Sequence, residues 1–210
     1  KAVGYFGEGI LHETYGSTEA GIVCNLRPID QLRKERCVGL GFACTDTKVL
    51  NKEGQPVEPG EVGELFSRSP YLFSGYWGNA RASGSNKEGW FSAGDLAKVD
   101  EEGFVYIVDR KTDMIISGGV NIYPREIEEV LYEHPVILDA AVIGVPDSYW
   151  GQSVKAYIVL RKNQNVASEE LKGFCEKTLS GYKIPKSFEF ISALPRGSTG
   201  KVLKRKLYDL

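Results

Sequence analysis

The sequence has few residues that bind transition metals or form disulfides. It contains four cysteines, two histidines and one methionine in 210 residues. The cysteines are widely spaced and no two of them form a CxxC pair, so a zinc site would lack ligands. We therefore expect reduced thiols, as in a cytoplasmic protein.

Long apolar runs and an excess of charge of one sign are also missing. No apolar run approaches the roughly 18–20 residues that span a bilayer, and the start of the chain does not have the pattern of a signal peptide. The formal net charge of −2 gives no whole-protein attraction to nucleic acid. The patterns GxSxG and HExxH do not occur, which leaves a serine hydrolase or a zinc peptidase without support.

Short β-type runs fill the region between residues 38 and 108. The runs "TKVL", "EVGELF", "LAKVD" and "FVYIV" are separated by Gly-containing turns such as "NKEG" and "EEG", a pattern typical of hairpins. Several strands in so short a stretch predict a small sheet or a β-barrel-like subdomain, which we assign to residues 29–108.

The pattern changes after residue 112. Pro124 suits a first helical turn, and apolar residues then recur at helical spacing until "HP" ends the helix. Buried strands are predicted at 138–145 and 153–160 and another in "SFEFI", with a second helix capped by Ser168. This βαββαβ-like order predicts a compact α+β domain after a boundary in the charged stretch 109–113.

Two clusters in the first half carry polar groups that suit a nucleotide. In "YGSTEAG", Tyr15 offers a ring for stacking, Thr18 a hydroxyl for a phosphate and Glu19 a hard oxygen for Mg²⁺. In "GWFSAGDL", Asp95 follows a glycine at the start of a strand, where an acidic residue can hold sugar hydroxyls. Taken singly, both clusters also fit ordinary turns, the first of them as a turn that caps a helix.

Two further clusters lie in the second half. Arg110 begins "DRKTDMIISGGVNIYPREIEEVL", in which "SGG" is expected to expose backbone to a thin ligand before a helix. Lys201 follows the glycines of "GSTG", and a lysine there is a mobile charge that can follow a developing negative charge. The spacing is not that of GxxxxGK[ST], and Val202 stands where Ser or Thr is required. The alternatives are a linker and a solvated turn.

In this order the clusters resemble the later core motifs of the adenylate-forming superfamily. That family contains acyl- and aryl-CoA synthetases, peptide-synthetase adenylation domains and beetle luciferases. The resemblance covers nearly the whole chain, and "SGGVNIYPREIEE" is most similar to the fatty- and aryl-acid CoA synthetases. It is carried by "YGSTE", "GELFSRSPYLFSGYW", "GWFSAGDL", "DRKTDMIISGGVNIYPREIEEVL", "GYKIP" and "LPRGSTGKVLKRKL".

The resemblance implies an ATP-dependent, AMP-forming acid–CoA ligase that acts on a fatty or aromatic acid. The carboxylate attacks the α-phosphate of ATP and forms an acyl-adenylate with release of pyrophosphate, and the thiol of CoA then displaces AMP. The implied catalytic residues are Lys201, Thr18 and Glu19, with Glu19 as the ligand of Mg²⁺. The implied nucleotide-binding residues are Tyr15, Gly16, Asp95 and Arg110.

The resemblance also implies a moving domain. Ser117, Gly118 and Gly119 would line the path of CoA, and Thr112, in the segment 109–112, would be the hinge. The mobile α+β domain would cover residues 113–210, and residues 1–28 would be a remnant of a large N-terminal α/β domain.

Some positions depart from the family pattern. Asp or Lys is usual at the place of Thr112, and Thr is frequent at the place of Ala93. The family's "SGTTGxPKG"-like phosphate loop does not occur in this sequence, so we expect a C-terminal fragment that is inactive alone. Two alternatives stay open, a carrier-protein thiol as the acceptor and a non-catalytic homologue that binds nucleotide or a protein partner; an oligomer is compatible with the sequence.

Overall fold

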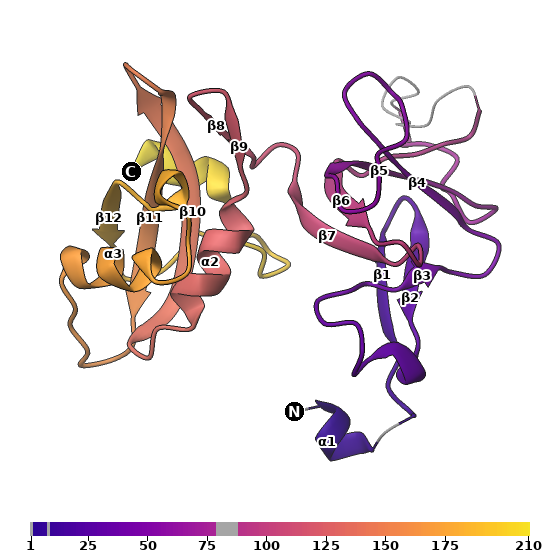
Figure 1. Ribbon diagram of the computed structural model, residues 1–210, viewed down its shortest axis with the longest axis horizontal. Coiled ribbons are helices and arrows are strands. Elements are labelled where there is room, and N and C mark those ends of the chain that lie inside the picture. The colour runs from indigo at the N-terminus through magenta and orange to yellow at the C-terminus, as the bar shows by residue number, and fades with distance from the viewer. Residues whose placement is uncertain (1, 8, 79–87) are drawn as a thin grey trace. The chain divides into compact units, whose positions relative to one another are not determined.

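The chain forms two compact units, Lys1–Lys111 and Thr112–Leu210, in a computed structural model that describes residues 2–7, 9–78 and 88–210 (Figure 1). Both units contain strands and helices, so the predicted α+β class is confirmed. The division falls inside the charged stretch 109–113. Within the described residues, no helix has the length and apolar character needed to cross a membrane.

The first unit contains two antiparallel sheets. A bridge between Gly39 and Val105 links them, and in the described residues they do not close into a barrel. The short helices are α1 (Ala2–Phe6) and η1 (Pro28–Asp30). One sheet consists of β1 (Glu13–Ser17), β2 (Gly21–Leu26) and β3 (Leu40–Gly41), and the other of β4 (Asp46–Leu50), β5 (Gly63–Arg68), β6 (Asp95–Val99) and β7 (Val105–Arg110).

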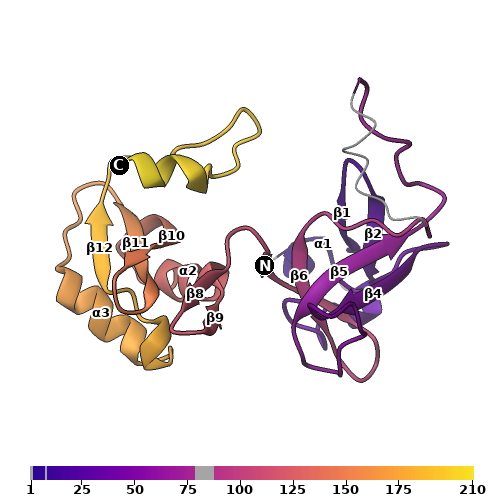
Figure 2. The ribbon, with the colours of Figure 1, turned by 90° about the horizontal axis from the view of Figure 1, so that it is seen from above.

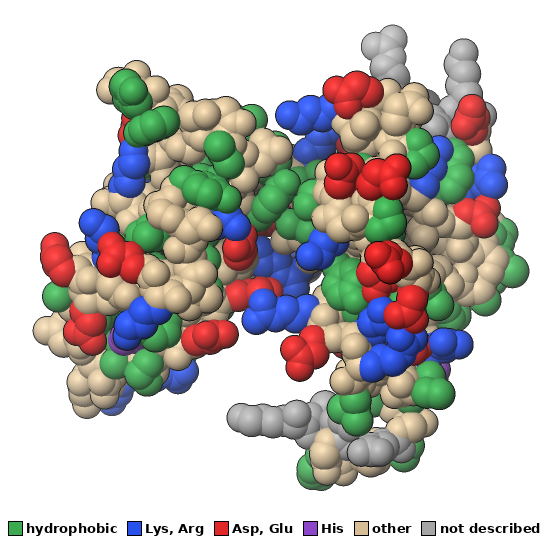
Figure 3. Space-filling view, in the orientation of Figure 1, with side chains coloured by type: hydrophobic (Ala, Val, Ile, Leu, Met, Phe, Trp, Pro, Cys, Tyr) green, Lys and Arg blue, Asp and Glu red, His purple; other side chains and the backbone are tan. Residues whose placement is uncertain are grey.

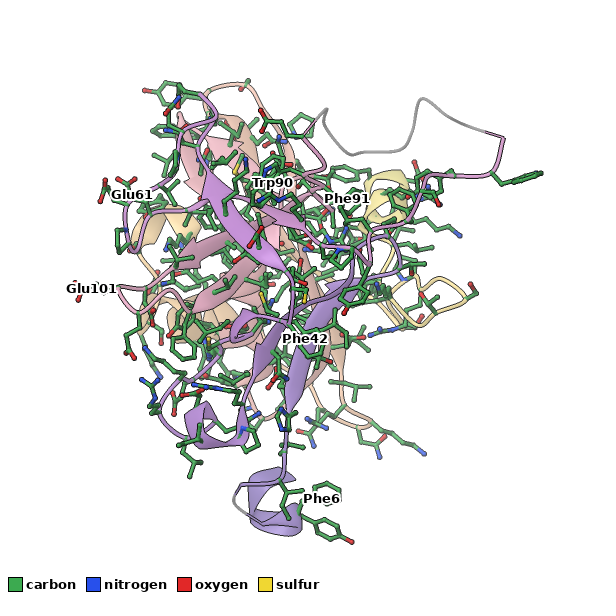
Figure 4. All side chains as sticks on the ribbon, turned by 90° about the vertical axis from the view of Figure 1, so that its right-hand side faces the viewer. Phe6, Phe42, Glu61, Trp90, Phe91 and Glu101 are labelled. Carbon is green, nitrogen blue, oxygen red and sulfur yellow. The ribbon has the colours of Figure 1, made fainter. Side chains whose placement is uncertain are left out.

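The two sheets of this unit share one apolar core. Val23 and Cys24 of β2 pack with Val49, Leu65 and Val105 of the other sheet. In Figure 4 the aromatic side chain of Phe91, which is buried in this core, lies among the strands, whereas Phe6 stands apart on α1. The common core makes β1 and the β6–β7 hairpin parts of one rigid body, because packed interiors resist deformation.

The second unit begins with a two-stranded hairpin and continues into a three-stranded sheet. In that sheet β10 and β11 are antiparallel and β12 runs parallel to β11. Its elements are β8 (Ile115–Ser117), β9 (Val120–Ile122), α2 (Pro124–Tyr132), β10 (Ile137–Asp147), β11 (Gly151–Leu160), α3 (Ser168–Glu176), η3 (Gly181–Lys183), β12 (Ser187–Phe190) and η4 (Lys204–Asp209). The predicted order of strands and helices is confirmed.

The start of α3 differs from the prediction. Ser168 is the first helical residue, and the cap position belongs to Ala167, which has extended backbone and makes no side-chain hydrogen bond to the helix. The helix therefore depends on its buried face for stability, with Leu171 and Cys175 fully buried. An apolar face of this kind outweighs a missing cap, which contributes about 1 kcal/mol.

Helices cover both faces of the β10–β11–β12 sheet. Neighbouring residues of a strand point to opposite faces, so Val142 packs toward α2 and α3 while Ala141 and Ile143 face the other side. That other side is covered by the C-terminal segment, whose Leu207 is fully buried. Figure 2 shows α3 and η4 on opposite sides of this sheet.

One hydrogen bond fixes η4 on the sheet. The hydroxyl of Tyr157, a fully buried residue of β11, donates to the carbonyl oxygen of Leu207 at 2.7 Å. Both partners are inaccessible to water, so the carbonyl has no substitute donor if the hydroxyl is removed. This contact and the burial of Leu207 hold the C-terminal segment to the body of the unit.

We predict that Tyr157→Phe lowers the unfolding free energy of the second unit by about 1–3 kcal/mol, because it leaves a buried carbonyl without a donor. Urea unfolding of the chain followed by circular dichroism measures the change. Tyr208→Phe is the matched control: Tyr208 is 57% exposed, and its change should stay within about 0.5 kcal/mol. Equal effects of the two substitutions would contradict the anchoring role.

Candidate active site

The β1–β2 hairpin presents Thr18 and Glu19 in its turn. Pairing shifts at a bulge between Tyr15 and Gly16, and a Cβ atom at Gly16 would lie 1.9 Å from the carbonyl oxygen of Gly21. Glycine is therefore required at position 16 for the two backbones to approach. The turn joins two strands, so the helix cap that was the alternative interpretation is wrong.

The carboxylate of Asp95 is the centre of the site in the first unit. Asp95 is 7% exposed and pairs with Arg110 across the β6–β7 hairpin. Arg110 places its Nε 2.8 Å from Asp95 Oδ1, and the hydroxyl of Tyr15 donates to Oδ2. Strands β1, β6 and β7 therefore converge on one carboxylate.

Tyr15 remains a neutral donor in this arrangement. Burial raises the pKa of its hydroxyl far above the ordinary value, and the hydrogen bond to Asp95 raises it further. A small hollow beside its ring is lined by Ser17, Ala20, Phe91 and Ala93 among others. The hollow has a volume of only about 10 Å³, so the half-buried ring packs closely against its neighbours while its hydroxyl is committed to Asp95.

Glu19 has a partner that the sequence did not reveal. The hydroxyl of Tyr76 donates to Glu19 Oε1 at 2.6 Å, and this hydrogen bond lowers the pKa of Glu19. The backbone N–H of Phe73 donates to the carbonyl oxygen of Glu19 at 2.8 Å. The segment that contains Phe73 and Tyr76 therefore supports the turn, and the only sequence signal was its run of aromatic residues.

A single accessible carboxylate suits Mg²⁺ better than it suits zinc. Within the described ranges, no three His, Cys, Asp or Glu side chains gather into a metal cluster. Mg²⁺ is commonly held by one or two carboxylates together with substrate phosphates and water. Glu19 is half-buried, and its lowered pKa keeps it ionised to more acidic pH than an ordinary glutamate, so it fits a magnesium ion that arrives with a nucleotide.

The division between the units falls at Thr112, an exposed residue. On the side of the first unit, the N–H of Lys111 donates to the carbonyl oxygen of Gly94 at 2.8 Å, and its ammonium lies 2.7 Å from Glu64. On the other side, Thr112 Oγ1 donates to Asp113 at 3.2 Å. Backbone anchoring therefore ends at Lys111.

The "SGG" segment is the turn of the β8–β9 hairpin. Gly118 and Gly119 have φ angles of +58° and +80°, as a type I′ turn requires. A Cβ atom at Gly118 would lie 2.6 Å from the ring of Trp150, and the N–H of Gly118 donates to the carbonyl oxygen of Trp150 at 2.9 Å. Beside this turn is a groove of about 330 Å³, lined by Ser117, Gly118, Val120, Trp150, Val154, Gly181, Tyr182, Ile184 and Lys186.

Lys201 lies in the second unit, in a small hairpin over residues 196–202. The yellow loop near the C-terminus in Figure 2 contains this hairpin. A bridge between Arg196 and Val202 closes the hairpin, and the N–H of Gly197 donates to the carbonyl oxygen of Lys201 at 2.9 Å. The Lys201 side chain is exposed, and in the part of the chain that the structure describes it makes no hydrogen bond or ion pair. The backbone is thus held while the cation is free.

The predicted site residues therefore fall into two groups. The first unit brings Tyr15, Asp95 and Arg110 into direct contact, with Gly16 shaping the hairpin that carries Thr18 and Glu19. The second unit holds the remaining predicted residues, with Thr112 as its first residue. On the face shown in Figure 3, basic and acidic side chains lie interspersed over each unit. The residues that sequence reasoning missed are Tyr76, Trp150 and Tyr182.

Two family profiles match the chain. The family described as "AMP-binding enzyme" matches residues 1–77, and "AMP-binding enzyme C-terminal domain" matches residues 126–201. Both matches agree with the family resemblance that the motifs indicate. The chain belongs to the adenylate-forming superfamily.

Relatives with curated functions include CoA ligases for different acids. The chain is 43% identical over 203 residues to a long-chain-fatty-acid–CoA ligase of Bacillus subtilis, in a match that covers 96% of this chain and 36% of that protein. It is 43% identical over 192 residues to a feruloyl-CoA synthase of Amycolatopsis, covering 90% and 39%. The chain thus spans less than two fifths of the length of these relatives.

Solved structures of the same superfamily share the fold. An o-succinylbenzoate CoA synthetase of Bacillus subtilis in complex with its acyl-adenylate is 37% identical, with a TM-score of 0.88 over 95% of this chain and 41% of that one. The same enzyme in complex with ATP and a magnesium ion is 36% identical, with a TM-score of 0.86 over 94% and 41%. An amide bond synthetase of Marinactinospora thermotolerans is 33% identical, with a TM-score of 0.86 over 96% and 42%.

We predict that Gly16→Ala destabilises the first unit by about 1–3 kcal/mol, because the added methyl group overlaps the Gly21 carbonyl. Gly173→Ala is the control: Gly173 lies in α3, and a Cβ atom there would meet no other atom within 4 Å, so alanine should stabilise by about 0.5–1 kcal/mol. Denaturant unfolding measures both changes. If Gly16→Ala leaves the unfolding free energy unchanged, the bulge does not require glycine at position 16.

We predict that Tyr76→Phe raises the pKa of Glu19, because it removes the hydrogen bond that favours the carboxylate. A group with a lowered pKa keeps its charge to more acidic pH, so loss of the donor moves its protonation to higher pH. NMR titration of the Glu19 side chain measures the shift. Tyr71→Phe, a change at an exposed tyrosine of the same segment, should leave the titration unchanged.

Proposed function

We propose that this chain is the C-terminal part of an acid–CoA ligase. The enzyme activates a carboxylic acid with ATP to an acyl-adenylate, releases pyrophosphate, and transfers the acyl group to the thiol of CoA with release of AMP. The observation that carries the proposal is the convergence of Tyr15 and Arg110 on Asp95, on the same rigid body as Glu19. Family membership restricts the chemistry to adenylate formation.

Asp95 has the capacity to hold a ribose. A carboxylate accepts about four hydrogen bonds, and Tyr15 and Arg110 supply one donor to each of its oxygens. The remaining acceptor positions suit the two hydroxyls of a ribose. The Tyr15 ring is half-buried, and its accessible part would stack near the adenine.

The Thr18–Glu19 turn would meet the phosphates. The exposed hydroxyl of Thr18 can donate to a phosphate oxygen, and Glu19 would hold Mg²⁺. When bound, the metal offsets the negative charge of the phosphates. Gly16 keeps this turn in register with Tyr15, so the ring and phosphate contacts are built from one hairpin.

Lys201 supplies a cation that can arrive and leave. Bringing a carboxylate to an α-phosphate joins two anions, and a lysine beside both offsets their repulsion as charge develops. Its ammonium is at the end of a flexible stem on an anchored hairpin. We propose that rotation at Thr112 brings Lys201 to the nucleotide for the first step and removes it for the second.

The groove beside the β8–β9 turn would take part of CoA in the second step. Gly118 has no side chain to cover its backbone there. Val120 and Trp150 offer apolar surface, and Lys186 offers a positive charge. A thin, mostly apolar chain with a phosphate group suits this lining. Ser117 stands at the edge of the same groove.

The fold alone does not determine which acid is activated or which thiol accepts the acyl group. The relatives act on long-chain fatty acids and on ferulate, as their names state, and one structural neighbour is an amide bond synthetase. ATP–pyrophosphate exchange in the full-length protein, screened over short, long and aromatic acids, identifies the acid. Dependence of AMP release on CoA then separates CoA from a carrier-protein thiol.

We predict that Lys201→Ala in the full-length protein lowers the rate of acyl-adenylate formation by about 10²–10³-fold, the usual effect of losing one charge-stabilising donor. Pyrophosphate exchange measures the loss. CoA attack on a supplied acyl-adenylate should keep its rate, since Lys201 has left by then. Lys206→Ala, an exposed lysine on η4, is the control and should behave as the parent. Unchanged exchange in the Lys201 variant would favour a non-catalytic binding module.

A further inference from the structure

The first end of the Lys201 hairpin is held by Arg196. One arm of its guanidinium donates to the carbonyl oxygen of Gly200 at 2.6 Å, in the peptide that directly precedes Lys201. The other arm forms an ion pair with Asp139 of β10. Arg196 therefore links the backbone beside Lys201 to the central sheet of the unit.

Asp139 is itself fixed in place. Its side chain is 16% exposed, and it accepts hydrogen bonds from the hydroxyl of Tyr132 at 2.6 Å and from the N–H of Ala140 at 3.1 Å. Tyr132 is the last residue of α2. The first anchor thus connects the hairpin to both a strand and a helix.

The second end is held by Lys204, three residues after Lys201. Its ammonium lies 2.7 Å from Glu128 Oε1 of α2, and both side chains are 16% exposed. The same Glu128 oxygen accepts the N–H of Val142 in β10 at 2.8 Å. Lys204 also lies 4.0 Å from Asp113, the residue that follows Thr112.

Both anchors fasten the hairpin to the same two elements, α2 and β10. Charge-assisted hydrogen bonds are stronger than neutral ones. The partly buried Lys204–Glu128 pair is less screened by salt than the Arg196–Asp139 pair, in which the arginine side chain is 46% exposed. A hairpin rich in glycine would otherwise sample many conformations. Catalytic placement is sensitive, since a displacement of about 1 Å can cost about 10²-fold in rate.

We propose that Arg196 and Lys204 are positioning residues for Lys201, holding both ends of its hairpin on α2 and β10. This inference rests on the proposed function, in which Lys201 assists acyl-adenylate formation. Neither residue would touch the reacting atoms. Their effect passes entirely through the placement of Lys201.

The test uses ATP–pyrophosphate exchange in the full-length protein with its best acid. Arg196→Met and Lys204→Met should each lower kcat at least 10-fold and leave the KM for ATP within twofold, since the nucleotide contacts belong to the first unit. Arg205→Met and Lys206→Met are the matched controls, because both are exposed side chains of η4. They should stay within twofold of the parent.

A double variant tests whether the effect passes through Lys201. In a Lys201→Ala background, adding Lys204→Met or Arg196→Met should change the exchange rate by less than twofold. CoA attack on supplied acyl-adenylate should also stay within twofold in both single variants. A purely structural defect would slow that second step and would add to the loss in the Lys201 variant, and either result would overturn the proposal.

The outcomes separate this inference from the function on which it rests. If Lys201→Ala is crippled and the Arg196 and Lys204 variants are not, the positioning role is wrong and the function stands. If Lys201→Ala itself exchanges normally, the proposed function fails. Should a methionine variant not fold, Glu128→Gln and Asp139→Asn replace it, because they keep the shape of the side chain and an oxygen that accepts the neighbouring backbone N–H. Each should lower kcat at least 10-fold. Lys204→Arg keeps the positive charge and should retain the activity that Lys204→Met loses.

Discussion

The carboxylate of Asp95 is the contact on which the nucleotide side of the site depends. It accepts from Tyr15 of β1 and from Arg110 of β7, residues that are far apart in the sequence. Because the carboxylate is buried, each donor compensates part of the cost of removing its charge from water. The same two donors fix the directions of its remaining lone pairs. The Asp95 carboxylate therefore joins strands β1, β6 and β7 and also presents the free acceptor positions of the candidate site.

The proposed function also requires a cation that can leave the place where it acts. The structure places Asp95 and Glu19 in one compact unit and Lys201 in the other. Each unit has its own apolar core, so motion at a single exposed residue leaves both cores intact. We expect any such motion to occur near Thr112, because contacts hold Lys111 and Asp113 on either side of it. A hinge of this kind would not need a charged side chain, which is compatible with threonine at position 112.

Much of the fold could be predicted from the sequence, because its elements follow strong local patterns. The strands β10 and β11 are long apolar runs, and Pro124 marks the start of α2 in both the sequence and the structure. The prediction that Ser168 caps α3 was wrong. The helix begins at Ser168 without a side-chain cap, because its buried face stabilises it instead. The local sequence pattern alone does not reveal whether capping or burial of the apolar face contributes more to the stability of the helix.

The candidate site was predictable as a list of residues and unpredictable as a set of contacts. Family motifs pointed to Tyr15, Asp95 and Arg110, but the hydrogen bond from Tyr15 to Asp95 joins strands that are distant in sequence. Tyr76 was missed because its bond to Glu19 depends on the path of a loop. The roles of these residues in catalysis stay predictions.

The burial of Leu207 has a consequence for proteolysis. Arg205 and Lys206 are exposed on η4, between the Lys201 hairpin and the leucine that fastens this segment to the sheet. A trypsin-like cut after either basic residue would sever the tail while leaving every residue of the site in the chain. The hairpin that carries Lys201 would then lose its apolar tether beyond Lys204, although the cut itself lies outside the candidate site.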